Sequence, residues 1–261
     1  MLQALKELIK YRDLLYMLTV RDIRIRYKQA VMGFMWAIFM PIVAVAAGIL
    51  IKEAMSVVSG RAVDINGVVS ISVKVLPWTF FISAIKFAVQ SLVGNSTLVT
   101  KIYFPRAVLP LASIAACLFD LAISALVLMV ILCFVHLGVS VQILWVPVIL
   151  LFLVLYTTGL GLLLAAANLF YRDVKYVVEI ILMFGIFFTP VFYDISSFGR
   201  FKLFMQLNPI GSMLEALNQA VVLKQMPDLQ WLAYAGVSSV IMFWIGILIF
   251  HSKEQLFAEN I

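Results

Sequence analysis

Long apolar stretches separated by short polar segments form the pattern of this 261-residue chain. Six of them are long enough, at about 1.5 Å per helical residue, to reach across most or all of a bilayer's hydrocarbon core. They comprise residues 31–51, 75–94, 107–135, 143–170, 176–190 and 229–250. The pattern predicts an all-α integral membrane protein with six transmembrane helices.

The first thirty residues follow another pattern. Apolar side chains recur there at roughly helical spacing among charged ones, which is typical of an amphipathic helix on a membrane surface. Ile23, Ile25 and Tyr27 alternate with charges as an exposed strand would, but a single short strand has nothing to pair with. We therefore expect a helix.

The segment between the fifth and sixth stretches, residues 191–228, is neither a clean loop nor a clean span. Gly199, Pro209, Gly211 and Pro227 divide it into pieces too short to cross a bilayer. Such pieces are typical of re-entrant or interfacial helices.

Cationic residues orient the chain. Arg21, Arg24, Arg26 and Lys28 directly precede the first span, and cations beside a span are retained in the cytosol. Residues 1–30 are therefore expected to form a cytosolic amphipathic segment and residues 31–261 a single transmembrane domain with both termini cytosolic. In this arrangement residues 52–74 form an external loop, and most of the 19 Lys and Arg residues lie inside.

Composition supports the membrane class and excludes others. The chain is 64% hydrophobic and 12% charged, with a mean hydropathy of +1.10. Its net charge of +6 is expected to orient the spans and attract anionic lipids, and the absence of a basic soluble domain argues against nucleic-acid binding. The sequence has no phosphate-binding GxxxxGK[ST] loop, and its residues show neither a catalytic motif nor the spacing of metal ligands. Cys117 and Cys133 lie in the same apolar stretch, which indicates neither a disulfide nor a metal site.

Several short blocks occur together in a fixed order. They are RDIRIRYK at 21–28 with GFMW at 33–36, NS at 95–96 with KIYFPR at 101–106, NLFYRDV at 168–174, TPV at 189–191 and NP at 208–209. In combination they resemble the membrane subunits of ABC-2 type exporters, specifically the permeases that export lipid-linked O-antigen, teichoic acid or capsule polysaccharide. The likeness is greatest to the O-antigen permeases of the Wzm type.

This resemblance implies a homodimer in the bacterial plasma membrane, working with two copies of a separate cytosolic P-loop ATPase. ATP and Mg²⁺ would bind that partner, so no cofactor is expected in this chain. The implied substrate is a polysaccharide on a polyprenyl-pyrophosphate carrier. The resemblance also implies that the segment after the fifth span forms an external gate, for which Pro190 and Pro209 are the candidates.

The cytosolic connectors are the candidate contacts for the ATPase. A solvated loop is the plain alternative, but aromatic side chains in a short cytosolic turn favour an interface anchor. The candidate residues are Lys101, Tyr103, Phe104, Pro105, Arg106, Tyr171, Arg172 and Asp173.

Charged residues near or within the spans are candidates for the substrate path, because such charges usually face a bundle interior or a water-filled route. These are Lys86, Asp120, Arg24, Arg26 and Lys28. For Asp120 we favour a structural ion pair or hydrogen bond between helices, since an acid would repel pyrophosphate. For Lys86 both interpretations stay open.

Two other functions are weaker alternatives. A membrane-embedded transferase acting on polyprenyl-linked sugars needs clustered carboxylates or a metal, but Asp22, Asp173 and Glu179 lie in separate segments. An ion-coupled secondary transporter ordinarily shows repeated halves, and none is evident.

Overall fold

A computed structural model describes residues 10–28, 33, 35–59, 65–101, 104–134, 138, 140–193, 195 and 202–258. These residues are helical apart from short connections, and none of them lies in a strand, as the all-α prediction requires. The α-helices are α2 (Arg12–Lys28), α3 (Met35–Ser59), α4 (Ile65–Gly94), α5 (Ser96–Lys101), α6 (Val108–Phe134), α7 (Trp145–Phe170), α8 (Val174–Gly185), α9 (Lys202–Gln206), α10 (Pro209–Val221) and α11 (Leu229–Lys253). Short 3₁₀ turns are η1 (Val141–Leu144), η2 (Ile186–Phe188) and η4 (Glu254–Ala258).

Five of the described helical segments are long and apolar enough to cross a membrane. They are Met35–Ala54, Asn66–Gly94, Val108–Val130, Val141–Phe170 and Leu229–Phe257. The fifth predicted span, 176–190, corresponds to α8 with η2, whose α-helical part has only 12 residues. That part rises about 18 Å, which is less than the hydrocarbon thickness.

The expected external loop at residues 52–74 is largely helical instead, so that prediction was wrong. Lys52 lies within α3, and α4 begins at Ile65 and carries Lys74 in its first half. Lys74 is only 1% exposed because its ammonium group donates to the carbonyl oxygen of Tyr193 at 3.1 Å and lies 4.0 Å from a carboxylate oxygen of Glu215. These partners from distant segments let a cation enter the bundle.

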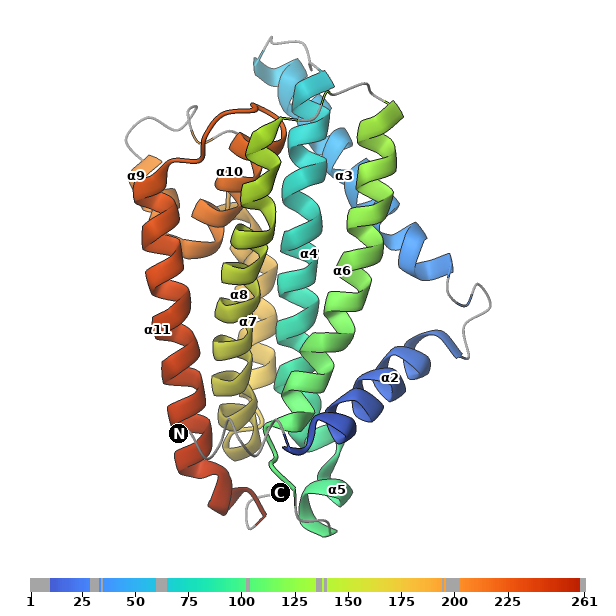
Figure 1. The fold of residues 1–261 in the computed structure, drawn as a ribbon, viewed down its shortest axis with the longest axis vertical. Coiled ribbons are helices and arrows are strands. Elements are labelled where there is room, and N and C mark those ends of the chain that lie inside the picture. Colours follow the sequence, from blue (N-terminus) through green and yellow to red (C-terminus); the bar gives the residue numbers. More distant parts are fainter. Residues whose placement is uncertain are drawn as a thin grey trace.

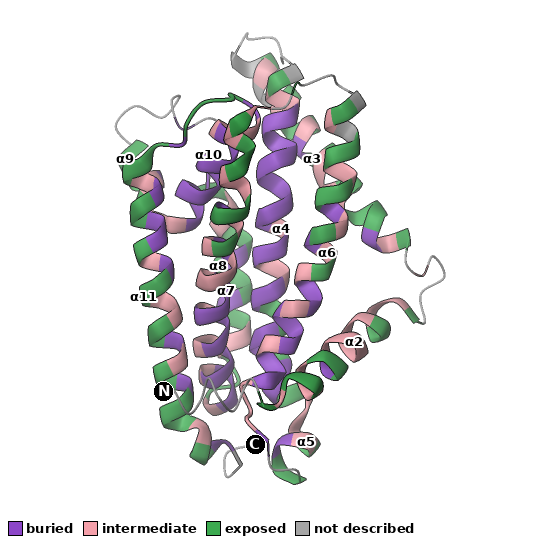
Figure 2. Cartoon of the chain, viewed as in Figure 1, coloured by how far each residue is buried: buried purple, intermediate pink, exposed green. Residues whose placement is uncertain are grey.

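Helix α4 is the centre of the bundle (Figure 1). It packs against α3, α6, α7, α8 and α10, and it is buried over most of its length (Figure 2). A helix that is apolar on all sides is expected in such a position. By contrast, α3 leans away from the bundle and is largely exposed.

Helices α7 and α11 form the most extensive pair. Their backbones meet at two glycines: a Cβ atom built on Gly246 would lie 2.1 Å from the carbonyl oxygen of Gly159. Glycines at these positions therefore allow the two helices to approach closely.

Helix α2 crosses the base of α6 obliquely (Figure 1). It runs without interruption through residues 21–28, which confirms the helical prediction for the alternating segment. The predicted helix over residues 1–9 lies outside the described residues. Leu18 is the buried anchor of α2, while Tyr16 and Met17 beside it are exposed.

Candidate functional site

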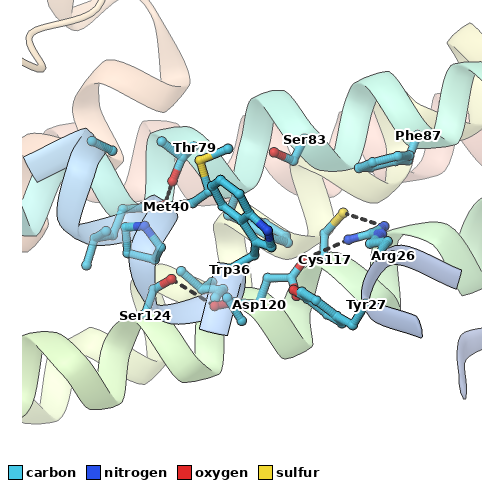
Figure 3. Close-up of a pocket in the computed structure, with 16 residues that line it drawn as sticks. Arg26, Tyr27, Trp36, Met40, Thr79, Ser83, Phe87, Cys117, Asp120 and Ser124 are labelled. Carbon is cyan, nitrogen blue, oxygen red and sulfur yellow. Dashed lines mark hydrogen bonds and ion pairs between the residues drawn. The ribbon is translucent and has the colours of Figure 1, made fainter. Parts of the chain in front are cut away.

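A cavity of about 490 Å³ opens where α2, α3, α4 and α6 meet (Figure 3). Its walls combine apolar side chains, among them Met40 and Phe80, with the hydroxyls of Thr79, Ser83 and Ser124. Two charged residues line it, Arg26 from α2 and Asp120 from α6. The cavity is therefore amphipathic, with its charge gathered at the end formed by α2.

Arg26 and Asp120 form an ion pair across this cavity. A guanidinium nitrogen of Arg26 donates to Asp120 Oδ2 at 2.6 Å, and the Tyr27 hydroxyl donates to Asp120 Oδ1 at 2.6 Å. Arg26 also donates to Cys117 Sγ at 3.3 Å and lies 4.0 Å above the Phe87 ring. Asp120 therefore has the interhelical ion pair that we favoured for it, and Arg26 uses two of its five N–H donors in these hydrogen bonds.

The spacing of residues on the two helices explains this contact. Ser113, Cys117 and Asp120 lie on one face of α6, since residues three and four apart are helical neighbours. Asp22 and Arg26, four apart on α2, face them: Ser113 Oγ donates to Asp22 Oδ2 at 3.2 Å. The Arg26–Asp120 and Asp22–Ser113 contacts together fix the position of α2 along α6.

Tyr27 stays a hydrogen-bond donor to this pair at any physiological pH. Burial, assisted by its hydrogen bond to Asp120, raises the pKa of the Tyr27 phenol well above its ordinary value. Sequence reasoning did not single out Tyr27 or Cys117 as site residues, because neither carries a fixed charge. For Cys117, its helical spacing of three residues from Asp120 was the available signal.

The other predicted substrate-path residues lie outside this cavity. Arg24 and Lys28 are exposed on α2, and Lys86 is exposed on α4, next to Phe87. The structure thus brings two of the five predicted residues together. Among the described residues, no group of three or more His, Cys, Asp or Glu side chains is placed to hold a metal ion.

The predicted coupling connector is anchored to the bundle rather than free. Phe104 is 7% exposed and belongs to a second buried cluster, which includes Leu18 of α2, Leu92 of α4 and Leu169 of α7. Phe104 therefore holds the connector to the chain's own helices. Lys101 is exposed, whereas Tyr103 lies outside the described residues.

The C-terminal turn η4 clamps the same connector. The backbone N–H of Arg106 donates to Glu254 Oε1 at 2.7 Å, and its guanidinium donates to the Glu254 carbonyl oxygen. Phe257 is fully buried, with its ring 5.0 Å from that of Phe250 and 5.8 Å from that of Phe170. Sequence reasoning treated this tail as a plain cytosolic end and missed the clamp.

The second connector predicted to be cytosolic presents exposed side chains. Tyr171, Arg172 and Asp173 are all exposed between α7 and α8. Asn168 near the end of α7 holds this turn in place. Its Nδ2 donates to the Val89 carbonyl oxygen at 2.9 Å, and its Oδ1 accepts from the Lys175 N–H at 3.2 Å. The buried amide positions the turn, and the three residues after it remain available on the surface.

The two proline segments expected at the external gate meet in the structure. Asn208 caps α10 by accepting from the Ile210 N–H at 3.1 Å, and its amide donates to Thr189 Oγ1 at 3.0 Å. Pro209 is the first residue of α10. Pro190 packs closely against Gly211, since a Cβ atom built on Gly211 would lie 3.0 Å from Pro190 Cδ. The turn after η2 and the start of α10 are therefore one packed unit.

Comparisons with known proteins agree with this architecture. The profile of the ABC-2 type transporter family matches residues 13–222. An O-antigen export system permease protein, RfbA of Myxococcus xanthus, is 27% identical over 264 residues, covering all of both chains. A protein of the same name from Klebsiella pneumoniae is 25% identical over 250 residues, covering 95% of this chain and 94% of the relative.

The family profile spans α2 to α10, which includes the cavity and both predicted coupling connectors. The expected resemblance is thereby confirmed, and so is the expectation of a transport subunit rather than an enzyme. The chain belongs to the ABC-2 type transporter family.

Proposed function

We propose that this chain is the permease subunit of an ATP-driven exporter that moves a polyprenyl-pyrophosphate-linked polysaccharide out of the bacterial cytoplasm. The observation that carries the proposal is the family match over residues 13–222, joined to five apolar helices. The names of the curated relatives support O-antigen as the glycan. The family also implies an ATPase partner, which this chain needs because its sequence has no phosphate-binding loop.

The direction of the helices supports six crossings. Phe170 ends α7 and contacts Phe257 just after α11, so both helices finish at the same end of the bundle. The chain between them must therefore return to the opposite end, and α8 with η2 makes that return. We assign α9 and α10 to the external half as a re-entrant gate, with Pro190 and Pro209 at its turns.

The charges orient this bundle. Helix α2, α5 and the turn η4 lie at one end (Figure 1), and α2 carries Arg21, Arg24, Arg26 and Lys28. Cations beside the first span place that end in the cytosol, with residues 1–30 as a cytosolic segment and 31–261 as the transmembrane domain. Both termini are then cytosolic, and the membrane is the plasma membrane.

The cavity at Arg26 is the proposed entry point for the lipid carrier. Its apolar wall suits an isoprenoid chain, and Arg26 keeps N–H donors beyond those that bond Asp120 and Cys117. Guanidinium groups recognise phosphate oxygens well because their donors form a planar fork. Exposed Arg24 and Lys28 on the same helix add attraction for the pyrophosphate and for anionic lipids.

A homodimer with two ATPase copies completes the proposed transporter. The ATPases would contact Lys101, Pro105, Tyr171, Arg172 and Asp173, together with Tyr103 and Arg106 of the same connectors. Since Phe104 and η4 tie the first connector to the bundle core, a movement of that connector must move the helices. The direct test is deletion of this chain: surface polysaccharide should disappear and lipid-linked glycan accumulate inside. Unchanged surface polysaccharide would contradict the proposal.

Truncation of the connector anchor should uncouple the ATPase. Phe104→Ala removes a buried ring, which typically costs about 3 kcal/mol, and should loosen the connector, reduce co-purification of the ATPase and abolish export. Lys101→Ala, the control at an exposed position of the same connector, should be milder. Full ATPase binding and full export in Phe104→Ala would disprove a coupling role for this segment.

Cysteine labelling in intact cells tests the orientation. After replacement of Cys117 and Cys133 by alanine, Gln225→Cys should react with an impermeant thiol reagent, because Gln225 is exposed between α10 and α11. Thr100→Cys, exposed on α5 at the other end, should react only after the cells are opened. The reverse labelling pattern would refute the six-span orientation.

A further inference from the structure

A second cavity, of about 440 Å³, lies at the end of the bundle opposite to α2 and η4. Residues of α4, α10 and the α10–α11 connection form most of it, and its lining is mainly polar, unlike that of the Arg26 cavity. It continues into a smaller hollow, since Gln206, Glu215, Gln219 and Asp228 line both. Cavities of about 300–1,000 Å³ with a few convergent polar groups are the usual form of small-ligand sites.

Two buried polar atoms in this cavity lack a protein partner. Ser70 and Asn218 are each only 4% exposed, and both side chains line the cavity. Within the described part of the chain, Ser70 Oγ and Asn218 Oδ1 have no hydrogen-bond partner. Buried polar groups are nearly always hydrogen-bonded, so these two oxygens indicate that a ligand supplies the missing bonds.

The charges around the cavity are of both signs and favour neither an anion nor a cation as that ligand. Glu215 and Asp228 line it together with Lys52 and Lys202, and Lys74 lies 4.0 Å from a carboxylate oxygen of Glu215. A neutral group with many hydroxyls matches this mixture, because each hydroxyl both donates to a carboxylate or amide oxygen and accepts from an ammonium group.

An aromatic ring lies beside these polar groups. Trp231 lines the smaller hollow together with Glu215 and Gln219. The smaller hollow, of about 10 Å³, has room for a water molecule only, so the sugar contacts fall to the acid, amide and hydroxyl groups of the larger cavity.

We propose that this cavity is a sugar-binding site on the exit side of the permease, which holds pyranose units of the exported chain as they leave. Ser70, Asn218, Glu215 and Gln219, which line the cavity, hydrogen-bond the sugar hydroxyls. Asp228, which lines both hollows, also contacts the sugar. The inference rests on the proposed function, because it takes the transported glycan as the ligand.

Binding of free glycan to the purified full chain tests the inference. The probe is the host's own polysaccharide, released from its carrier by mild acid, and its binding to the detergent-purified protein is measured by isothermal titration calorimetry. Removing two hydrogen-bonding groups with Ser70→Ala and Asn218→Ala together should weaken binding about tenfold. The matched controls are Ser72→Ala, on the same helix but outside the cavity lining, and Gln225→Ala, exposed in the α10–α11 connection.

The outcomes separate this inference from the proposed function. Saturable binding that is weakened only in the cavity variant supports the site. No binding, equal binding in the cavity variant, or an equal loss in the control variants overturns it, while normal export in cells leaves the proposed function intact. If the deletion strain exports glycan normally, the proposed function fails instead.

Discussion

Replacing Gly246 with alanine is expected to separate α11 from α7 and leave little folded protein. The added Cβ would lie 2.1 Å from the Gly159 carbonyl oxygen and 2.7 Å from its carbon and Cα. These neighbours are backbone atoms, so no side chain can rotate aside to make room. Overpacking typically costs about 1–3 kcal/mol, and a clash with backbone should reach the upper end or exceed it. Because this helix pair is the most extensive in the bundle, the loss of its packing should destabilise the other helices as well.

The measurement is the yield of monodisperse protein by size-exclusion chromatography, with its thermal midpoint. Gly159→Ala should behave similarly, since its Cβ would lie 2.4 Å from the Met242 carbonyl oxygen. Gly94→Ala is the control: nothing lies within 4 Å of a Cβ there, and alanine favours a helix. Normal yield and midpoint for Gly246→Ala would show that the two helices do not meet as described.

Asp120→Ala is expected to destabilise the protein by about 2 kcal/mol and to impair export. The change leaves the Arg26 guanidinium partly buried without its carboxylate, and it removes the acceptor of the Tyr27 hydroxyl. Loss of one partner from a fully buried pair typically costs about 3–5 kcal/mol. Here Arg26 is 17% and Asp120 29% exposed, so solvent reduces that penalty.

A double-mutant cycle isolates the pair. Arg26→Ala with Asp120→Ala should be more stable than the sum of the two single losses predicts, because no unpaired charge remains. Export by the double variant should stay low, since Arg26 is proposed to meet the carrier. Asp13→Ala on the same helix is the control; its pair with Arg12 is 79% and 89% exposed and should contribute almost nothing. Strictly additive losses would show that Arg26 and Asp120 do not interact.

The spans were predictable where apolar runs are continuous. The predicted stretch 107–135 agrees closely with α6, Val108–Phe134, because polar segments bound it on both sides. The start of α4 was missed since Ser70, Ser72 and Lys74 make its first turns look like a loop. Such side chains are tolerated in a helix when distant segments satisfy them, as Tyr193 and Glu215 satisfy Lys74.

Two charged members of the site, Arg26 and Asp120, were predictable from the sequence, but their pairing was not. Arg26 and Asp120 are 94 positions apart, and a local pattern gives each charge but not its partner. The connector shows the same limit. Phe104 was expected to face a partner protein, yet the structure buries it in the chain's own core. Burial of an aromatic residue in a short turn depends on which helices lie beneath it, and that is a tertiary property.

Translocation in a reconstituted system tests the central claim most directly. The purified chain and its ATPase partner are placed together in lipid vesicles, and a lipid-linked polysaccharide is supplied on the ATPase side. We predict that the glycan becomes protected from an external glycosidase only when ATP is hydrolysed, and that protection is lost without the ATPase. Continued ATP hydrolysis with no protected glycan, or protection driven by an ion gradient without ATP, would contradict the account.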